Sequence, residues 1–498
     1  MIEKKVVTRF APSPTGYLHV GGLRTALYAY LFAKQNNGVF LLRIEDTDRE
    51  RFLETGVRNI LDSLYWAGIV PDEGVVLDNE NHIVQKGEHG SYIQSERLEV
   101  YSDYARFLLE KKVAYRCFCT KDRLSQIRLE MQNAGLVPKY DRHCLGLTQQ
   151  EIETFTQEKF PHVIRLKIPE YEVTSFTDEI RGTIQYPNKD LDDQVLIKSD
   201  GFPTYHMAVV VDDHLMNVTH VIRGEEWISS TPKHIILYNA FGWKIPVYAH
   251  LPLLLNADRS KLSKRQGDVA VLDYKQQGYI PKAMVNFVAL LGWNPGTEKE
   301  IFSLSELVDV FSLNKINKSG AYFNKEKLNW FNREYLKSMT SAEIHKSILE
   351  EIPDIQQIPG YKNSIFTKII PIIIERMNTF CDVKEMLEKK EIQFFFTQPQ
   401  YDIEMLIPKK STGGNIFDNL KNVESILQTL DTWDRVSIKK SLWDFATERG
   451  RGEVLWPMRV ALSGLEFSPD PFLIAEIVGK DETLTRLHHA FKKLQNYK

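Results

Sequence analysis

Apolar residues near the N-terminus follow a strand pattern, then a helix pattern, then a strand pattern again. Residues 6–10 form a short β-branched run that the proline-rich segment 12–16 ends, which predicts a buried strand. A helix is expected from near Gly22, because apolar residues recur there at helical spacing: Leu23, Ala26, Leu27, Tyr30 and Leu31. Residues 39–44 are almost all apolar, as in a strand covered on both faces. This order favours a parallel sheet, which binds ligands beyond the carboxyl ends of its strands.

Further along the chain the pattern predicts more strands, separated from the first ones by a polar stretch. We expect these strands at residues 194–198, 204–211, 218–223 and 247–255. Residues from about 105 to 194 are polar and charged and carry most of the cysteines, so we expect a domain inserted between the strands. From about residue 320 helical spacing dominates, with helices expected at 341–351, 364–377 and 473–495. The sequence therefore predicts an α/β fold followed by a helical C-terminal region.

Composition narrows the class of protein. The chain has 498 residues, of which 43% are hydrophobic and 26% charged, so it is long enough for about three domains. The four cysteines are too few and too uneven for a disulfide framework, which indicates a reducing compartment. No apolar run approaches the roughly 20 residues of a membrane span, and the N-terminus lacks a signal-peptide pattern. We therefore expect a cytoplasmic protein without a membrane partner. The net charge of -3 requires any nucleic-acid contact to use local patches.

Two adjacent glycines stand where the first loop meets the first predicted helix. Gly21 and Gly22 let a ligand approach the backbone closely, and the free N–H groups of a helix start attract phosphate. His19, just upstream, can donate a hydrogen bond to a phosphate oxygen. Taken alone, the segment favours the simpler interpretation, a tight turn that His19 caps.

A second candidate for phosphate binding lies at residues 258–267. Four basic residues fall within seven positions there: Arg259, Lys261, Lys264 and Arg265. Such a run is most often a solvated surface turn. Mobile lysines on a Ser/Gly-rich loop are also what a triphosphate requires when charge builds up during phosphoanhydride cleavage.

The two segments together resemble the signature motifs of a known enzyme family. Residues 19–22 (His-Val-Gly-Gly) resemble the HIGH motif, and residues 261–265 (Lys-Leu-Ser-Lys-Arg) the KMSKS motif, of class I aminoacyl-tRNA synthetases. The match is closer still to the bacterial type of glutamyl-tRNA synthetase. Four more segments resemble that family in its order: residues 9–16, 43–48, 203–206 and 221–227.

The resemblance implies a Rossmann-like parallel-sheet catalytic domain, an inserted acceptor-stem domain and an all-helical C-terminal anticodon-binding region. The implied ranges are 1–105 and 195–265 for the two catalytic halves, 106–194 for the insert, 266–330 for a helical stem-contact region and 331–498 for the anticodon-binding domain. The implied reaction is ATP-dependent ligation of L-glutamate to tRNA(Glu), through glutamyl adenylate and then transfer to the 3'-terminal ribose. The family also implies a monomer. Whether tRNA(Gln) is charged as well stays open.

A glutamate pocket should present two cationic donors and one anionic acceptor, because glutamate has two carboxylates and one ammonium. Arg9 and Arg223 follow apolar strand residues and supply the cations, and Glu45 can accept from the ammonium. Ser13 and Tyr205 add hydroxyl groups. The alternative is an ordinary salt bridge between Glu45 and one of the two arginines. Which arginine takes which carboxylate also stays open.

The resemblance assigns the ATP site to the two phosphate-binding segments. His19, Gly21 and Gly22 are expected to hold the triphosphate, Lys264 to stabilise the developing charge, and Lys261 to assist it. Mg2+ is expected to neutralise the β- and γ-phosphates. Neither step requires an enzyme nucleophile, so catalysis is expected to come from in-line positioning and charge stabilisation.

The predicted insert contains a possible Zn2+ site. Cys117, Cys119 and Cys144 resemble part of a zinc site found in some relatives, with Tyr140 or His143 as the fourth ligand that tetrahedral zinc needs. The sequence favours the simpler interpretation, in which the three cysteines are part of a small core.

Three other functions fit parts of the sequence. A shortened paralogue that attaches glutamate to a modified tRNA base would lack the helical last third. A non-catalytic homologue that binds nucleotide or RNA would not need His19, Gly21, Lys261 and Lys264. A dinucleotide-dependent oxidoreductase would carry Gly-x-Gly-x-x-Gly after the first strand, and this chain does not.

Overall fold

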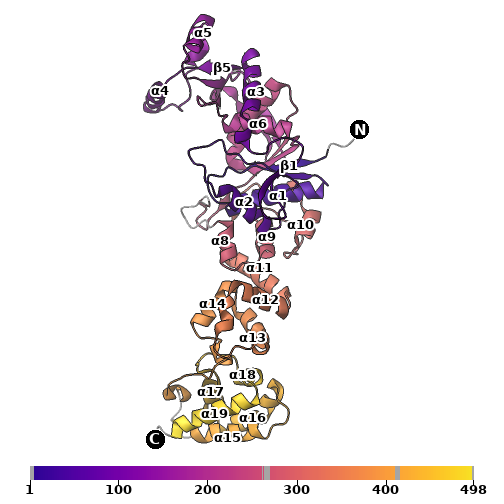
Figure 1. Ribbon diagram of the computed structural model, residues 1–498, viewed down its shortest axis with the longest axis vertical. Helices are drawn as coiled ribbons and strands as arrows, with labels where there is room; N and C mark the ends of the chain where they lie inside the picture. Colours follow the sequence, from indigo (N-terminus) through magenta and orange to yellow (C-terminus); the bar gives the residue numbers. More distant parts are fainter. Residues whose placement is uncertain (1–4, 261, 263–269, 410–415, 496–498) are drawn as a thin grey trace. The chain divides into compact units, whose positions relative to one another are not determined.

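The chain divides into two compact units, Met1–Gln276 with Pro281–Leu328 and Gln277–Ile280 with Asn329–Lys498. The computed structural model describes residues 5–260, 262, 270–409 and 416–495. Figure 1 shows the first unit in indigo to pink and the second in orange to yellow. None of the described helices combines the length and the apolar character that crossing a membrane requires.

An eight-stranded sheet forms the framework of the first unit, with strand order β4-β3-β2-β1-β10-β11-β7-β8. Its strands are β1 (Val7–Phe10), β2 (Val39–Leu42), β3 (Glu73–Leu77), β4 (Ile83–Lys86), β7 (Val173–Asp178), β8 (Gly182–Pro187), β10 (His220–Gly224) and β11 (Val247–Leu251). Neighbours from β3 to β7 are parallel, and the two edge strands are antiparallel to their neighbours. The prediction of a Rossmann-like parallel sheet is therefore confirmed.

Helices pack on this sheet through their apolar sides. α1 (Val20–Gln35) contacts β1, β2 and β10, and it buries Leu23, Leu27 and Leu31. A second apolar cluster joins α3 (Leu98–Glu110), α6 (Tyr205–Leu215) and α7 (Thr231–Phe241). α2 (Gly56–Trp66) also belongs to this unit.

The strand expected at residues 204–211 is wrong, because this segment lies in helix α6. Its residues from Met207 to Val211 are all buried. A continuous run of buried apolar residues cannot distinguish a covered strand from a buried helix by its period. The correction matters for the site, because a helix carries the next two residues, Asp212 and Asp213, into the interior.

The segment predicted as an insert over 106–194 contributes to two different sheets. β5 (Ala114–Cys117), β6 (Val163–Leu166) and β9 (Val195–Ile197) form a separate three-stranded antiparallel sheet, accompanied by α4 (Lys121–Asn133) and α5 (Gln149–Gln157). β7 and β8, in contrast, pair with β11 at the edge of the main sheet. The sequence predicted the β9 segment in the main sheet and the β7 segment in the insert. The structure has β7 in the main sheet and β9 in the small one. A loop connection brings β7 back to the main sheet, and the hydrophobic pattern does not encode such pairing.

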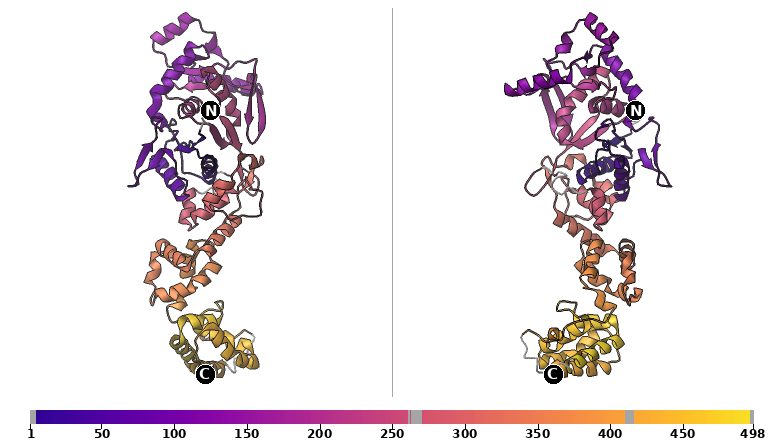
Figure 2. Two further views of the ribbon diagram at one scale, coloured as in Figure 1. Left: turned by 90° about the vertical axis from the view of Figure 1, so that its right-hand side faces the viewer. Right: turned by 60° about the vertical axis from the view of Figure 1, so that its left-hand side comes forward.

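The remainder of the first unit and the whole second unit are mainly helical. Residues 254–338 contain α8 (Val271–Gln276), α9 (Pro281–Ala289), α10 (Leu304–Val310), α11 (Lys325–Ser338) and the short strands β12 (Leu254–Leu255) and β13 (Ala321–Tyr322). The later helices are α12 (Ser341–Glu351), α13 (Asn363–Arg376), α14 (Phe380–Glu388), α15 (Ile416–Gln428), α16 (Arg435–Arg449), α17 (Arg451–Ser463), α18 (Pro471–Val478) and α19 (Lys480–Gln495). Figure 2 shows the second unit as helices joined by loops, which confirms the predicted helical region.

One long helix expected at 473–495 is interrupted. Gly479 has a φ of +90° and separates α18 from α19. This left-handed conformation suits glycine and ends a helix. The sequence pattern continues across it because both helices bury apolar residues against the same cluster.

Candidate active site

A cavity of about 1040 Å³ opens at the carboxyl ends of β1, β2 and β10. Its lining includes every predicted glutamate and ATP residue that the structure describes: Arg9, Ser13, His19, Gly21, Gly22, Glu45, Tyr205 and Arg223. Lys261 and Lys264 lie outside the described residues. Leu262, which stands between them in the sequence, lines the same cavity. The position follows from the parallel sheet, since strand ends leave a crevice there.

The first turn of α1 forms one wall of the cavity. His19 is the N-cap, and its Nδ1 accepts a hydrogen bond from the backbone N–H of Gly22 at 3.2 Å. A neutral histidine that accepts at Nδ1 carries its proton on Nε2, so Nε2 is a donor. A Cβ atom on Gly21 would lie 3.0 Å from the His19 ring. The capping role and the donor role of His19 are therefore compatible.

The start of α1 has the electrostatic character of an anion site. No acidic residue stands in its first turn. The unpaired N–H groups and the positive end of the helix dipole are therefore not balanced by a carboxylate of that turn. A phosphate group is the natural partner for such a terminus.

Arg9 is buried and ion-paired. Its side chain is 3% exposed, and its Nε lies 3.1 Å from Oδ1 of Asp213 on α6. Burial is the largest single effect and opposes its positive charge, but the charge and hydrogen bond of Asp213, together with Tyr205, outweigh it, so the pKa of Arg9 lies above its usual value. The ion pair occupies the Nε edge of the guanidinium, and Arg9 lines the cavity.

Arg43, which was not predicted as a site residue, links the acidic groups of this region. Its Nη2 lies 3.0 Å from Oε1 of Glu45, and its Nη1 lies 2.8 Å from Oδ1 of Asp213. Asp212 extends the network to Arg97 at 2.8 Å. The salt bridge considered for Glu45 therefore exists, but with Arg43 and not with Arg9 or Arg223.

Glu45 remains a candidate for the ammonium group of a substrate. It is 4% exposed and lines the cavity. Burial raises its pKa, and the positive charges of Arg43 and Arg9 partly offset this increase. Paired with Arg43 through Oε1, the carboxylate still has acceptor capacity at its other oxygen.

Arg223 differs from Arg9, because its partners are neutral. Its Nε donates to His250 Nε2 at 3.1 Å, its Nη1 to Tyr205 Oη at 2.8 Å, and its Nη2 to Thr231 Oγ1 at 2.8 Å. Within the described ranges no carboxylate oxygen makes an ion pair with it. It is 5% exposed and lines the cavity, so it is a buried cation that faces a ligand space without a counter-anion.

Aromatic side chains complete the wall around Arg223. The Tyr205 ring packs on Trp227 with centroids 4.2 Å apart, and burial raises the pKa of Tyr205. Behind it, His206 Nδ1 and His234 Nε2 are 3.0 Å apart. Burial, followed by nearby positive charges, lowers the pKa of both histidines. These rings are neutral at physiological pH and add no charge to the pocket.

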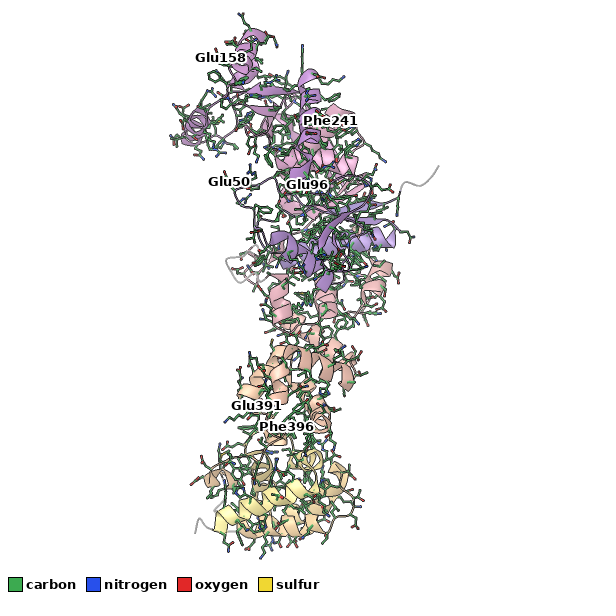
Figure 3. All side chains as sticks on the ribbon, in the orientation of Figure 1. Glu50, Glu96, Glu158, Phe241, Glu391 and Phe396 are labelled. Carbon is green, nitrogen blue, oxygen red and sulfur yellow. The ribbon has the colours of Figure 1, made fainter. Side chains whose placement is uncertain are left out.

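The opposite rim of the cavity comes from the loop after β2. Glu50 lies on this loop and lines the cavity, and Figure 3 labels it beside the ribbon. Lys198, at the end of β9, donates to the backbone oxygen of Thr47 at 3.1 Å. The three-stranded sheet is thereby tied to the loop that follows Glu45.

The three predicted cysteines do come together in the region around β5. The sulfur atoms of Cys117, Cys119 and Cys144 all lie within 4.8 Å of one another. The Tyr140 hydroxyl lies 3.3 Å from the sulfur of Cys117 and 3.4 Å from that of Cys119. His143 is exposed. Cys117, Tyr140 and Cys144 are also, with Tyr115, the buried members of a small apolar cluster.

Several residues of the site were not predicted from the sequence. These are Arg43, Asp178, Asp212, Asp213, His234 and His250. The adjacent carboxylates of Asp212 and Asp213, directly after an apolar run, were a usable signal, because acidic residues are rarely buried unless they are paired.

Family models match the chain over almost its whole length. Residues 5–330 match the model described as "tRNA synthetases class I (E and Q), catalytic domain". Residues 321–491 match the model described as "Anticodon binding domain".

Individual relatives agree with these models. The chain is 47% identical to a glutamate--tRNA ligase of Chloroherpeton thalassium, covering 99% of both chains. It is 43% identical to one of Clostridioides difficile, covering 97% of this chain and 98% of that protein. A crystal structure of a glutamate tRNA ligase from Elizabethkingia meningosepticum, in complex with its amino acid, superposes with a TM-score of 0.88 at 38% identity. That comparison covers 99% of this chain and all of the other.

Proposed function

The chain belongs to the class I tRNA synthetases for glutamate and glutamine, and we propose how its cavity carries out the glutamate reaction. It joins glutamate to tRNA in an ATP-dependent reaction that passes through glutamyl adenylate. The main support for a glutamate pocket is Arg223. This buried guanidinium lines the cavity and has only neutral hydrogen-bond partners among the described residues. Such a group calls for an anionic ligand.

The charges of the proposed pocket match those of glutamate. Arg9 and Arg223 offer guanidinium N–H groups for two carboxylates, and Glu45 offers a carboxylate for the ammonium group. The hydroxyl groups of Ser13 and Tyr205 add polar contacts. Glutamine would bring a neutral amide to one guanidinium and leave a buried charge unpaired, which costs several kcal/mol. The pocket therefore favours glutamate on electrostatic grounds.

ATP is proposed to bind with its triphosphate at the start of α1. The N–H groups near Gly21 and Gly22 and the Nε2–H of His19 would contact phosphate oxygens. Lys261 and Lys264 are proposed to neutralise the charge that develops when the α-phosphorus is attacked. Among the described residues, carboxylates and imidazoles are nowhere grouped in threes at metal-binding distances. Mg2+ is proposed to be held mainly by the β- and γ-phosphates, whose charge it neutralises.

The residues act by binding and orientation. The two guanidinium groups hold glutamate so that one carboxylate oxygen can approach the α-phosphorus, and the helix start holds the triphosphate in line with that approach. The expelled pyrophosphate stays at the same donors. The terminal ribose of tRNA then attacks the activated carbonyl, and no protein nucleophile is required.

tRNA is the macromolecular partner, and the specific acceptor is proposed to be tRNA(Glu). The support is the match of residues 321–491 to an anticodon-binding module that is helical here. A monomeric state and a cytoplasmic location stay predictions.

For the region around β5 we propose a structural Zn2+ site. Zinc–sulfur bonds of about 2.3 Å place the sulfurs of a tetrahedral site roughly 3.8 Å apart. The sulfurs of Cys119 and Cys144 are 3.5 Å apart, and the Tyr140 oxygen offers a fourth donor next to the thiols. The residues fit the ion, which would cross-link β5 to the segment around Cys144.

A charging assay tests the main proposal. Purified protein with ATP, Mg2+, labelled glutamate and tRNA should form an alkali-labile glutamyl ester on the RNA, and glutamine in place of glutamate should not. Glu45→Gln should raise the KM for glutamate about tenfold or more, because a charge-assisted bond to the ammonium is lost. The KM for ATP should not change. Protein that binds ATP but leaves labelled glutamate off the RNA would be the non-catalytic homologue.

A further inference from the structure

The Arg223 side chain has five N–H bonds, and their partners fall into two groups. Three bonds are well formed, to His250 at 3.1 Å and to Tyr205 and Thr231 at 2.8 Å each. The other two contacts, to His234 Nδ1 and to the Trp227 carbonyl, are 3.4 Å long. These longer contacts use one N–H on each terminal nitrogen. The Nε–H is thus committed to His250, and the terminal nitrogens keep the capacity for a ligand carboxylate.

His250 can accept this hydrogen bond in one protonation state only. Its Nδ1 lies 2.6 Å from Oδ2 of Asp178. The carboxylate of Asp178 also accepts from the backbone N–H groups of Ile180, Arg181 and His250, so it is an acceptor on every side. His250 Nδ1 must therefore carry the proton, and Nε2 is left as the acceptor for Arg223.

The three residues stand at the ends of neighbouring strands. Asp178 is the last residue of β7, His250 lies near the end of β11, and Arg223 lies near the end of β10. Arg223 and His250 are direct partners in the register of β10 and β11. Asp178 and His250 are both 1% exposed or less. The row leads from β7, the second strand from the edge of the sheet, across β11 to Arg223 at the cavity.

We propose that Asp178 and His250 are a positioning pair that fixes Arg223 for glutamate. Asp178 holds the Nδ1–H form of His250, and the lone pair on Nε2 then orients the guanidinium through its Nε–H. A carboxylate in direct contact would form an ion pair with Arg223, as Asp213 does with Arg9. The intervening imidazole orients the cation and leaves its charge for the substrate. This inference rests on the proposed role of Arg223 in glutamate binding.

The surroundings support a neutral His250. Burial is the main effect that lowers its pKa, and the positive charges of Arg223 and Arg181 lower it further against the opposing effect of Asp178. A proton on Nε2 would point at the Nε–H of Arg223 and break the contact. Tyr248 stacks parallel to the imidazole at 5.9 Å and adds no charge.

Four single variants test the pair. His250→Leu removes the acceptor, whereas His250→Gln keeps an amide oxygen that can accept from Arg223. Asp178→Asn offers an N–H group to Nδ1 and should turn Nε2 into a donor. His220→Leu is the matched control, because His220 lies at the opposite end of β10. KM for glutamate, KM for ATP, kcat and the thermal midpoint are measured for each.

We expect His250→Leu and Asp178→Asn to raise the KM for glutamate about tenfold or more, since each loses a hydrogen bond to a buried charge. His250→Gln should stay within about threefold of the native value, and no variant should change the KM for ATP. The effects of Asp178→Asn and His250→Leu should not add in the double variant, because both act through one contact.

Other outcomes overturn the inference or its premise separately. If the KM for glutamate and the KM for ATP rise equally and the thermal midpoint falls, the pair is a purely structural link between β7 and β11. If Arg223→Gln raises the KM for glutamate and His250→Leu does not, the positioning role is wrong and the pocket assignment stands. If Arg223→Gln leaves the KM for glutamate unchanged, the pocket assignment itself is wrong. If His250→Leu does not fold, the comparison of Asp178→Asn with His250→Gln tests the same point. The positioning role requires a raised KM for glutamate in the first variant and a nearly native value in the second.

Discussion

Three guanidinium groups of the catalytic region are almost equally buried but are balanced in different ways. Arg9 and Arg43 are 3% and 0% exposed and share the carboxylate of Asp213. Arg223 is 5% exposed and has neutral hydrogen-bond acceptors in place of a carboxylate. A buried pair is satisfied without a ligand, whereas a buried lone cation is not. The two cationic positions of the pocket therefore contribute differently. Arg9 is held in place by its ion pair with Asp213, whereas Arg223 adds a positive charge that no described carboxylate in direct contact balances.

A neighbouring histidine gives a pH test at the same scale. Burial, together with the charges of Lys233 and Arg223, lowers the pKa of His206 from 6.5 to about 3. Between these values the unfolded chain binds a proton that the folded chain does not bind. The free energy of unfolding therefore rises with pH through this window and falls as the pH drops below 6.5.

When the pH is lowered from about 7 to about 5, the thermal midpoint of His206→Asn should fall less than that of the native protein. The variant lacks the imidazole that takes up a proton on unfolding, so the pH dependence of its unfolding free energy should be smaller by up to about one proton. His234 has a pKa lowered in the same direction, so part of the loss should remain. An unchanged loss in His206→Asn would show that the folded chain protonates this ring.

Charge matching to the glutamate that the family resemblance implies pointed to Arg9, Glu45 and Arg223, and the structure places all three on one cavity. It could not reveal Asp213 or His250. Their importance depends on which strand ends and which helix lie next to the arginines, and sequence spacing carries no such information for residues separated by more than 200 positions, such as Arg9 and Asp213.

At the scale of elements, the main difference from the expected fold is the exchange between β7 and β9. β7 has six residues with alternating burial and β9 has only three residues, and strands this short fit either sheet, so their partners depend on the path of the connecting loops. β7 carries Asp178 to the edge of the main sheet, and β9 carries Lys198 to the loop beside the cavity. Helix α6 could not be distinguished from a strand, because every residue from Met207 to Val211 is buried. The parallel β1-β2 pair and α1 were predictable, since their periods differ clearly.

The cysteine cluster gives a test that belongs to one element group. We expect the purified protein to contain about one zinc per chain, since the three sulfur atoms lie within 4.8 Å of one another and the Tyr140 hydroxyl lies beside two of them. Cys144→Ser should release the metal and lower the thermal midpoint of the unit that contains β5. Elemental analysis and calorimetry measure both.

Cys381→Ser is the matched control for the zinc test, because Cys381 belongs to the second unit. It should keep the full zinc content. Metal-free native protein in which all four cysteines titrate as thiols would instead establish the small core that the sequence favours.

At the scale of the whole molecule, each unit has its own apolar core. The second unit is built on a large cluster that runs from Leu336 to Ala490. The cavity that we assign to glutamate and ATP belongs entirely to the first unit. Ligands raise the stability only of the part that binds them.

Calorimetry should therefore resolve two unfolding transitions. A non-hydrolysable ATP analogue should raise the midpoint of one transition and leave the other in place. Glutamate should raise the same midpoint further, whereas glutamine should add nothing to the effect of the analogue. A single transition, or an equal rise of both, would show that the units unfold as one. The helical second unit was predictable in outline, whereas the break at Gly479 was not, because apolar spacing continues across it.

The neutral ring of acceptors around Arg223 has a consequence for how this enzyme can evolve. Replacing the guanidinium with an uncharged side chain of similar size would remove a buried charge that pairs with none of the described carboxylates, and we expect such a variant to resist heat at least as well as its parent. The variant would also bind glutamate more weakly. Selection for robustness and selection for correct translation therefore oppose each other at this position, and only the second keeps the arginine there.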